Sequence, residues 1–355
     1  MGSDSSVHDT VVIWDEQFTA YDFGPTHPLR PIRLELTMAL AQAMGLLDGP
    51  GVTVAAPISA DDDVLALVHA PDYIAAVREA PHGYLARLRA FGLGTPDNPI
   101  FDGMHEASSL VAGASVQAAK AVWEGRASHA INISGGLHHA MPREASGFCV
   151  YDDPALAIAW LLENGAHRVA YLDVDVHHGD GVQEAFYSDP RVLTISLHES
   201  GQTLFPGTGW REETGSGDGQ GYSVNIPLRA GTDDADWHVA FDAEVPARLE
   251  AFRPQVLVSQ MGCDTHVLDP LAHLELTLTG QRRTYAKVHA LAHKYAGGNW
   301  VVTGGGGYDP ARVVPRSWAA LIAEVTGATL PDLVPEDWIA MAKERTGLVV
   351  PSGFA

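Results

Sequence analysis

The chain has 355 residues, 46% hydrophobic and 19% charged, a composition typical of a globular protein. Its formal net charge of −22 argues against nucleic acid as a partner, because phosphates would be repelled, and favours cationic ligands or peptides that carry lysine. No apolar run approaches the roughly 20 residues that span a bilayer, and the N-terminus lacks the pattern of a secretory signal. The two cysteines, Cys149 and Cys263, cannot form a disulfide framework, so we expect a cytoplasmic protein without a membrane partner; whether either thiol has a redox role stays open.

Eight apolar stretches bounded by turn residues predict strands. In chain order they are residues 11–14, 52–56, 129–134, 168–176, 192–198, 222–228, 255–262 and 299–303. Helical patterns lie between them, at residues 32–44, from Asp61, from Pro71, and at residues 105–123, 154–164, 233–251, 278–295 and from Pro310. Residues 81–101 are rich in Gly and Pro and predict the longest irregular segment, which is usually functional or mobile.

The alternation of strands and helices runs from end to end. It predicts an α/β fold with a mostly parallel sheet of about eight strands and helices on both faces. No repeat or linker divides the chain, so residues 1–355 are expected to form a single domain, with residues 1–10 flexible.

The predicted strand 168–176 contains polar residues at alternate positions. Side chains two residues apart on a strand share a face, so Asp173, Asp175 and, just beyond the strand, His177 are expected to project the same way. Two carboxylates and an imidazole on one side of a buried strand are costly unless a cation neutralises them. The alternative is a buried Asp–His hydrogen-bond network; the density of ionisable groups favours a metal site.

A third ligand can come from Asp264, which follows the predicted strand 255–262. Taken alone, Asp264 could equally be a turn residue whose side chain bonds its own backbone. Three protein ligands leave a position open for water, as in catalytic rather than structural zinc sites. A site with two Asp and one His could also accept Fe²⁺ or Co²⁺.

Four polar clusters each follow directly on a predicted strand. They are His138 with His139, Asp175 with His177, Asp264, and the run of four glycines that ends at Tyr308. In open α/β sheets, ligands bind outside the carboxyl ends of the strands. We therefore expect the four clusters to meet at one edge of the sheet.

The adjacent His138 and His139 follow two glycines, which allow a tight turn that presents both rings. A single histidine at a strand end is usually structural, but this pair favours function. The remaining acids, Asp173 and Asp180, could each hydrogen-bond one imidazole and raise its basicity.

Residues 304–307 are all glycine and can bend sharply enough to deliver Tyr308 toward the metal, where its hydroxyl could donate to a developing oxyanion. A nucleotide-binding loop is the competing interpretation, but it lacks the third glycine of the dinucleotide spacing and a following lysine. Phe148 and Phe205 lie in loops and suit either the core or the walls of a slot for an alkyl chain.

Together these motifs resemble those of the zinc-dependent histone deacetylase superfamily, which has the arginase/deacetylase fold. The resemblance covers nearly the whole chain, from His27-Pro28 to Tyr308. Within the family, the motifs Asp22-Phe-Gly-Pro and Gly92-Leu-Gly-Thr-Pro-Asp-Asn-Pro99 are most similar to the acetoin-utilisation type of bacterial deacetylase.

Carried over by position, the resemblance implies that Asp175, His177 and Asp264 bind zinc and that His139, paired with Asp180, is the general base and then acid. It further implies that His138, paired with Asp173, is its electrostatic partner and that Tyr308 polarises the carbonyl. The implied substrate-binding residues are Asp97, Gly147, Phe148, Phe205 and Leu271.

The family also has structural sites for K⁺ or Na⁺. By resemblance, one would use Asp173, Asp175, His177, Ser196 and Leu197, and the other Phe186, Asp189, Val192 and Tyr222. Many of these ligands would be backbone carbonyls, which residue identity barely constrains.

We therefore expect a metal-dependent hydrolase that removes acetyl, or other acyl, groups from lysine side chains of proteins. The rival with the same chemistry is an acetylpolyamine deacetylase; more distant rivals are a binuclear arginase-type hydrolase and a catalytically silent acyl-lysine binder. The resemblance suggests an acyl-CoA synthetase as the protein partner, while oligomeric state and acyl preference stay open. Two positions depart from the eukaryotic members of the family. Leu137 stands where they often carry an aromatic residue, and Asp97 lies in Thr-Pro-Asp-Asn rather than in their usual loop. Both differences put the substrate preference in doubt, not the chemistry.

Overall fold

Eight parallel strands form one sheet in the computed structural model, which describes residues 9–354. Their order across the sheet is β2-β1-β3-β8-β7-β4-β5-β6, and every pairing is parallel. The strands are β1 (Thr10–Ile13), β2 (Val52–Ala55), β3 (His129–Asn132), β4 (Val169–Asp173), β5 (Val192–Glu199), β6 (Ser223–Leu228), β7 (Val256–Gln260) and β8 (Trp300–Thr303). The sequence prediction of a single α/β domain with a parallel sheet is confirmed.

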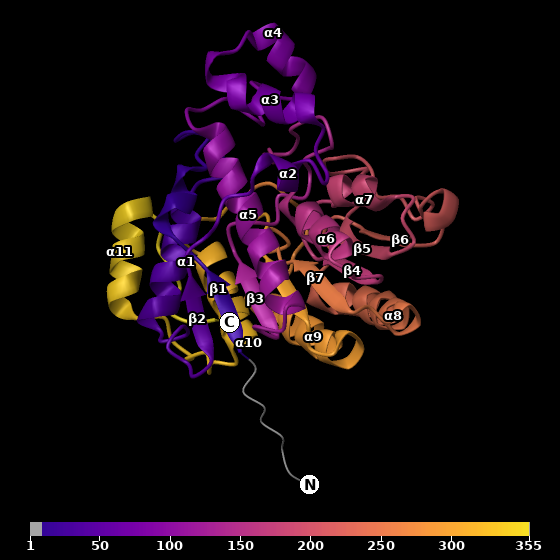
Figure 1. Ribbon diagram of the computed structural model, residues 1–355. Coiled ribbons are helices and arrows are strands. Elements are labelled where there is room, and N and C mark those ends of the chain that lie inside the picture. The colour runs from indigo at the N-terminus through magenta and orange to yellow at the C-terminus, as the bar shows by residue number, and fades with distance from the viewer. Residues whose placement is uncertain (1–8, 355) are drawn as a thin grey trace.

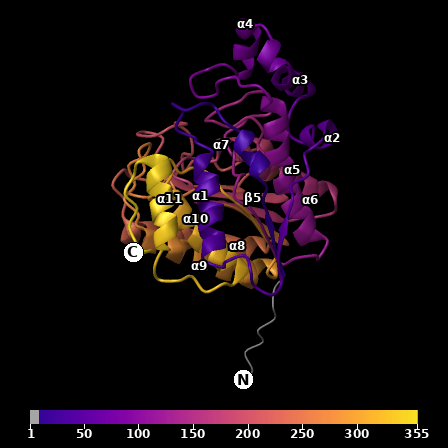
Figure 2. The same cartoon turned by 90° about the vertical axis from the view of Figure 1, so that its left-hand side faces the viewer.

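Helices lie against the sheet and above its edge (Figures 1 and 2). They are α1 (Ile32–Ala43), α2 (Asp62–Leu65), α3 (Pro71–Glu79), α4 (Leu85–Leu88), α5 (Met104–Trp123), α6 (Asp153–Glu163), α7 (Asp180–Phe186), α8 (Asp234–Phe252), α9 (Leu278–Ala296), α10 (Val314–Thr326) and α11 (Glu336–Thr346). Within the described residues, no helix combines the length and apolarity needed to cross a membrane.

Both faces of the sheet are covered, which explains why its central strands are mostly apolar, with polar residues near their carboxyl ends. On β3, the amide of Asn132 donates to the carbonyl of Val111 in α5. His129, three residues earlier and therefore on the opposite face, contacts His289 and His293 of α9. All residues of β3, β4, β5 and β7 are buried, so the core lies on both sides of these strands.

The strand order decides where the polar clusters lie. The strands that precede the four clusters are β3, β4, β7 and β8, and these are neighbours in the order β3-β8-β7-β4. Because all strands are parallel, their carboxyl ends meet at one edge, which faces α7 and the projecting α3 and α4 in Figure 1. The expected convergence is confirmed.

The strand predicted over residues 168–176 is too long, because β4 ends at Asp173. The N–H of Val174 still donates to the carbonyl of Gln260 in β7, but after Val174 carboxylates accept the backbone N–H groups. The N–H of Asp175 donates to Asp173 Oδ1 (3.1 Å), that of Val176 to Asp264 Oδ1 (2.9 Å) and that of His177 to Asp175 Oδ1 (3.0 Å). Asp175 and His177 therefore lie on a loop after the strand, and nearby carboxylates hold the backbone of this loop.

Three further expectations need correction. Residues 81–101 are not wholly irregular, because they include α4 and short 3₁₀ turns. The helix α7, which begins at Asp180, was not predicted, because Gly179 precedes it, Gly181 lies within it, and its seven residues carry little helical periodicity. Thr10 is buried within β1, so the expected flexible segment does not reach it, and residues 1–8 lie outside the described part of the chain.

Candidate active site

The three predicted metal ligands come together at the carboxyl edge of the sheet. One ligand atom each from Asp175, His177 and Asp264 lies within 4.8 Å of the others, and all three residues are buried. His177 Nδ1 lies 3.1 Å from Asp175 Oδ1 and 3.1 Å from Asp264 Oδ2. Burial and the nearby Asp175 carboxylate raise the pKa of Asp264 to about 6. A divalent cation between these donors would relieve that repulsion, so the donor set fits a metal.

Backbone and amide groups hold the carboxylate of Asp175 in place. Its Oδ2 accepts from Gln260 Nε2 (2.6 Å) and from the N–H of Gly306 (2.7 Å). Gln260 is the last residue of β7 and also donates to the carbonyl of Gly136 (3.2 Å), so it links three of the converging segments. Hydrogen bonds of this kind orient a metal ligand.

The two adjacent histidines are each tied to a different acid, as the sequence predicts. His138 Nδ1 lies 2.7 Å from Asp173 Oδ2, and His139 Nδ1 lies 2.6 Å from Asp180 Oδ1. A carboxylate accepts, so each ring carries its proton on Nδ1 and directs Nε2 away from the acid. The two Nε2 atoms lie 3.1 Å apart.

The same pair differs in charge. Burial lowers the pKa of His138, but the carboxylates of Asp173 and Asp175 outweigh it, and the pKa rises to about 9. Burial and the neighbouring charge of His138 lower the pKa of His139 to about 4. At neutral pH His138 is therefore a cation and His139 is neutral, and a neutral imidazole can accept a proton.

The turn that presents these rings depends on an acid outside the predicted set. Asp153, in the first turn of α6, accepts from the N–H groups of Gly136 (3.0 Å) and Leu137 (2.8 Å). Burial raises its pKa to about 6. It fastens the loop before His138 to the face of the sheet that α6 covers.

The glycine run after β8 lets the chain pass closely over the metal ligands. A Cβ on Gly306 would lie 1.9 Å from Asp264 Oδ2, so no other residue fits there. Gly305 and Gly307 have φ angles of 148° and 144°, which confirms the predicted need for glycine. The buried Arg33 donates to the carbonyls of Gly305 (2.7 Å) and Gly307 (3.2 Å) and lies over the ring of Trp318.

Tyr308 is delivered to the site by this loop. Its N–H donates to Asp269 Oδ2 (2.8 Å), and its ring lies edge-on to that of Phe148 with centroids 5.7 Å apart. Burial raises the pKa of Tyr308 well above its usual value, and the charges of Asp264 and Asp175 add to this. The hydroxyl therefore keeps its proton and can donate it.

A pocket of about 210 Å³ leads to this cluster. It is lined by Asp97, His139, Gly147, Phe148, His177, Leu204, Phe205, Leu271 and Tyr308. All five residues predicted for substrate binding are among them, with Asp97 exposed and Phe205 43% exposed at the outer end. The inner end consists of His139, His177 and Tyr308, so a narrow apolar passage ends on polar groups.

Sequence reasoning missed four residues that build this site: Arg33, Asp153, Leu204 and Gln260. Gln260 had a signal, because a polar side chain stands at the end of an otherwise apolar strand shortly before Asp264. Arg33 lies on α1, 272 residues before Gly305, and Asp153 lies on α6, 16 residues after Leu137. No spacing pattern could connect them before the fold was known.

Neighbouring segments hold the residues expected to bind monovalent cations; in the second set the N–H of Asp189 donates to the carbonyl of Phe186, and that of Val192 donates to the carbonyl of Asp189. Asp173 and Ser196 are partners in register on β4 and β5, with Leu197 next along β5. In the second set, the carboxylate of Asp189 pairs with Arg191, and the carbonyl of Tyr222 accepts from the N–H of Thr194. Both sites stay predictions.

The two cysteines do not join the site chemistry. Cys149 and Cys263 are free and buried, and burial raises the pKa of both thiols well above the usual value. A redox role requires a thiolate that is accessible, and this environment disfavours it.

The fold and the site together define a class of protein. Residues 27–325 match the family described as the histone deacetylase domain, and the chain belongs to this family. It is therefore related in sequence and structure to deacetylases.

Particular relatives narrow the comparison. The chain is 45% identical over 323 residues to the acetoin utilization protein AcuC of Bacillus subtilis (strain 168), covering 90% of this chain and 83% of that protein. It is 37% identical to AcuC of Staphylococcus xylosus over 91% of this chain and 84% of the relative. Two solved structures share the fold: an HDAC homolog complexed with SAHA (TM-score 0.87, 32% identity, 95% of this chain and 89% of that chain) and an HDAC homolog from Aquifex aeolicus (TM-score 0.86, 33% identity, 94% and 88%). The protein is an AcuC-like member of the family.

Proposed function

We propose that this protein hydrolyses acetyl-lysine, and other acyl-lysine, side chains of proteins with a divalent metal ion, zinc in the first instance. The observation that carries the proposal is the pocket whose apolar walls end on a buried Asp-His-Asp triad, a neutral imidazole and a protonated phenol. Such a passage suits the alkyl chain of lysine with its acyl group at the inner end.

The metal would be held by Asp175, His177 and Asp264, and Fe²⁺ or Co²⁺ would also suit this donor set. When bound, a cation of this kind polarises a carbonyl and lowers the pKa of a water molecule to around 7. The carboxylate of Asp175 is held by Gln260 and the backbone of Gly306, and that of Asp264 accepts from the N–H of Val176, so the protein orients both before any substrate arrives.

The protein groups move the protons. His139, oriented by Asp180, accepts a proton from the attacking water at Nε2 and returns it to the leaving amine. Tyr308 donates a hydrogen bond from its hydroxyl to the acyl oxygen, which becomes an oxyanion when water adds to the acyl carbon. The positive charge of His138 favours the same developing negative charge.

The acetylpolyamine alternative has one supporting observation, the net charge of −22, which would attract cationic substrates of either kind. Residues 81–104 form α4 and turns beside the pocket mouth, and Asp97 is exposed there. Comparing turnover of an acetyl-lysine peptide with that of acetylspermidine separates the two substrates.

A binuclear arginase-type reaction has less support. Asp269, the acid that hints at it, accepts from the N–H groups of Tyr308 and Leu271, and this fixes the loop. Among the described residues, three side chains rather than a larger set of bridging carboxylates meet at this site.

The deciding experiment is turnover of a panel of acyl-lysine peptides and acetylspermidine, with and without a hydroxamate chelator, at known metal content. Release of acetate from the peptides that is blocked by the hydroxamate and lost on metal removal supports the proposal. Turnover of acetylspermidine alone assigns the polyamine alternative, and tight peptide binding without turnover assigns a binder. As a protein substrate we propose an acetylated acyl-CoA synthetase, which this enzyme would meet in the cytoplasm. The proposed K⁺ or Na⁺ sites are tested by the dependence of the same turnover on those ions.

A further inference from the structure

Three histidines meet at the opposite edge of the sheet from the catalytic residues. His129 is the first residue of β3, and His289 and His293 lie on α9. One ring nitrogen from each lies within 4.8 Å of the others. His293 Nε2 lies 3.2 Å from His129 Nε2 and 3.0 Å from His289 Nε2.

The other nitrogens of two of these rings are held by acceptors. His129 Nδ1 lies 3.0 Å from the carbonyl of Val325, and His289 Nδ1 lies 2.7 Å from Glu324 Oε1. Because a carbonyl and a carboxylate accept, both rings carry a proton on Nδ1 and present the lone pair of Nε2 to the cluster. A carboxylate or carbonyl behind a histidine is the arrangement that orients metal-binding imidazoles.

The Nε2 atoms of the three rings face one another. His129 and His289, protonated on Nδ1, present lone pairs at Nε2, and both of these atoms lie within 3.2 Å of His293 Nε2. A metal ion would accept all three lone pairs. Zn–N bonds of about 2.0–2.1 Å in a tetrahedral site place neighbouring nitrogens roughly 3.3 Å apart, close to both observed distances.

The surrounding structure holds the rings in these positions. His289 and His293 are four residues apart on α9, so they project from one face of the helix. Trp300 of β8, the register partner of His129, stacks on His289 with ring centroids 5.3 Å apart and 16° between planes. His129 is buried, and the contact of its Nδ1 with the carbonyl of Val325 fixes the position of its Nε2.

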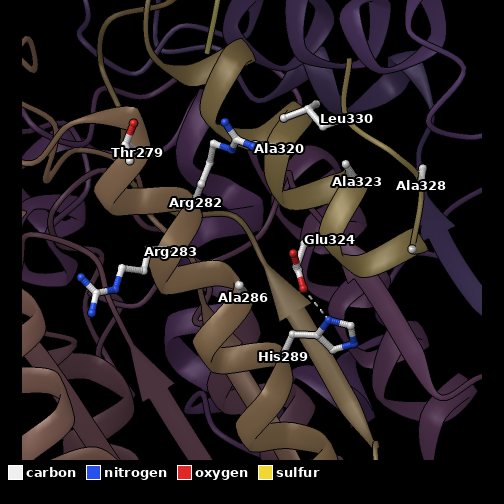
Figure 3. Close-up of a pocket in the computed structure, with 11 residues that line it drawn as sticks. Thr279, Arg282, Arg283, Ala286, His289, Ala320, Ala323, Glu324, Ala328 and Leu330 are labelled. Atoms are coloured by element: carbon white, nitrogen blue, oxygen red, sulfur yellow. Dashed lines mark hydrogen bonds and ion pairs between the residues drawn. The ribbon is translucent and has the colours of Figure 1, made fainter. Parts of the chain in front are cut away.

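His289 and His293 are only partly buried, so an ion could reach the cluster from solvent. His289 and its partner Glu324 also line a hollow of about 620 Å³ between α9 and α10, and Figure 3 shows the two joined at one side of it. Their side chains are 22% and 33% exposed. Water could complete the coordination.

We propose that His129, His289 and His293 form a second transition-metal site that binds Zn²⁺ or a similar late first-row divalent cation, with Glu324 orienting His289. Three imidazoles without thiolate suit zinc, nickel, cobalt and copper rather than calcium or magnesium. The site fastens α9 to the first residue of β3 and, through Glu324 and Val325, to the end of α10. Its role is therefore structural, and it is independent of the acyl-lysine reaction.

The test is metal stoichiometry of the full chain, stripped with a chelator and titrated with Zn²⁺. We expect two equivalents for the unmodified protein and one for His293→Ala, which keeps its deacetylase turnover. Asp264→Asn is expected to bind one equivalent and lose turnover, and Zn²⁺ should still raise its Tm. That rise should vanish in the double variant Asp264→Asn/His293→Ala.

Controls separate a lost ligand from lost folding. His167→Ala removes an exposed histidine from elsewhere and should keep two equivalents. Glu324→Gln should weaken the second Zn²⁺ about 10- to 100-fold without abolishing it, and His289→Gln offers a second ligand change if His293→Ala folds poorly. Equal Zn²⁺ stoichiometry in the unmodified protein, His293→Ala and His289→Gln would overturn the proposal. Loss of both equivalents in Asp264→Asn would also overturn it, because both ions would then belong to the catalytic loop.

Discussion

The Nε2 atoms of His138 and His139 lie 3.1 Å apart, although each ring is bound at Nδ1 to a different carboxylate. Two imidazoles this close cannot both be charged without strong repulsion, and the surroundings decide which one is. Asp173 and Asp175 keep His138 positive, with a pKa of about 9, while burial and then the charge of His138 lower the pKa of His139 and keep it neutral. The neighbours along the chain therefore have different chemical roles.

This difference predicts unequal effects of substitution. His139→Ala removes the group that accepts and returns the proton, so kcat should fall roughly 10²- to 10⁴-fold. His138→Ala removes only a charge beside the reaction and should cost less. Steady-state kinetics on an acetyl-lysine peptide, at matched metal content, measures both; a larger loss for His138→Ala would reverse the assignment.

Tyr308→Phe tests the oxyanion donor. The phenyl ring keeps the contact with Phe148 but lacks the hydroxyl, so kcat should fall roughly 10²- to 10³-fold with KM, metal content and Tm little changed. The matched control is Tyr84→Phe, which changes a tyrosine that is 78% exposed and should leave kcat unaltered. Near-normal turnover of Tyr308→Phe would remove this residue from the mechanism.

Gln260→Leu tests the support of the metal ligands. Leucine fills a similar volume but cannot donate to Asp175 Oδ2 or to the carbonyl of Gly136. We expect metal affinity at Asp175, His177 and Asp264 to fall roughly 10- to 100-fold, so activity should return when excess Zn²⁺ is added. Measured affinity equal to that of the unmodified protein would show that the hydrogen bond to Gln260 is dispensable.

Stability in acid should depend on His69, which is buried in the core and has no part in the proposed reaction. Its Nδ1 donates to the carbonyl of Met141 (3.1 Å), its Nε2 accepts from the N–H of Asp152 (2.9 Å), and burial lowers its pKa to about 4. The unfolded chain, with a pKa near 6.5, takes up this proton first as pH falls. The stabilisation is therefore complete above about pH 6.5 and is lost as pH drops toward 4.

The size of this effect follows from linkage. Between pH 7.5 and pH 5, His69 should account for about 2 kcal/mol of lost unfolding free energy. Asp153 titrates in the same range with the opposite sign, because its folded pKa is raised to about 6. The measurement is thus the difference between the unmodified protein and His69→Gln, by urea unfolding at several pH values. Identical pH slopes for the two proteins would contradict it.

Much of the architecture could be predicted from local pattern. The strands were recognised because a sheet covered on both faces requires continuous apolar runs, and each of the eight appears within a few residues of its expected place. The error at β4 has a physical cause: the carboxylates of Asp173, Asp175 and Asp264 take the backbone N–H groups that a neighbouring strand would otherwise receive. Hydrophobic pattern cannot reveal that competition.

The amino-acid sequence by itself determined which groups are available: the acids and imidazoles that follow the apolar strands, the glycines before Tyr308, and the loop aromatics. Only the tertiary structure decided which of them meet, because contact depends on the strand order β3-β8-β7-β4 and on helices such as α1, which supplies Arg33 from a distant part of the chain. The histidines of α9 illustrate the same limit. Their spacing of four residues places them on one face of a helix, but the third imidazole comes from β3, more than a hundred residues earlier, and only parallel packing of β3 beside β8 brings it within 3.2 Å of His293.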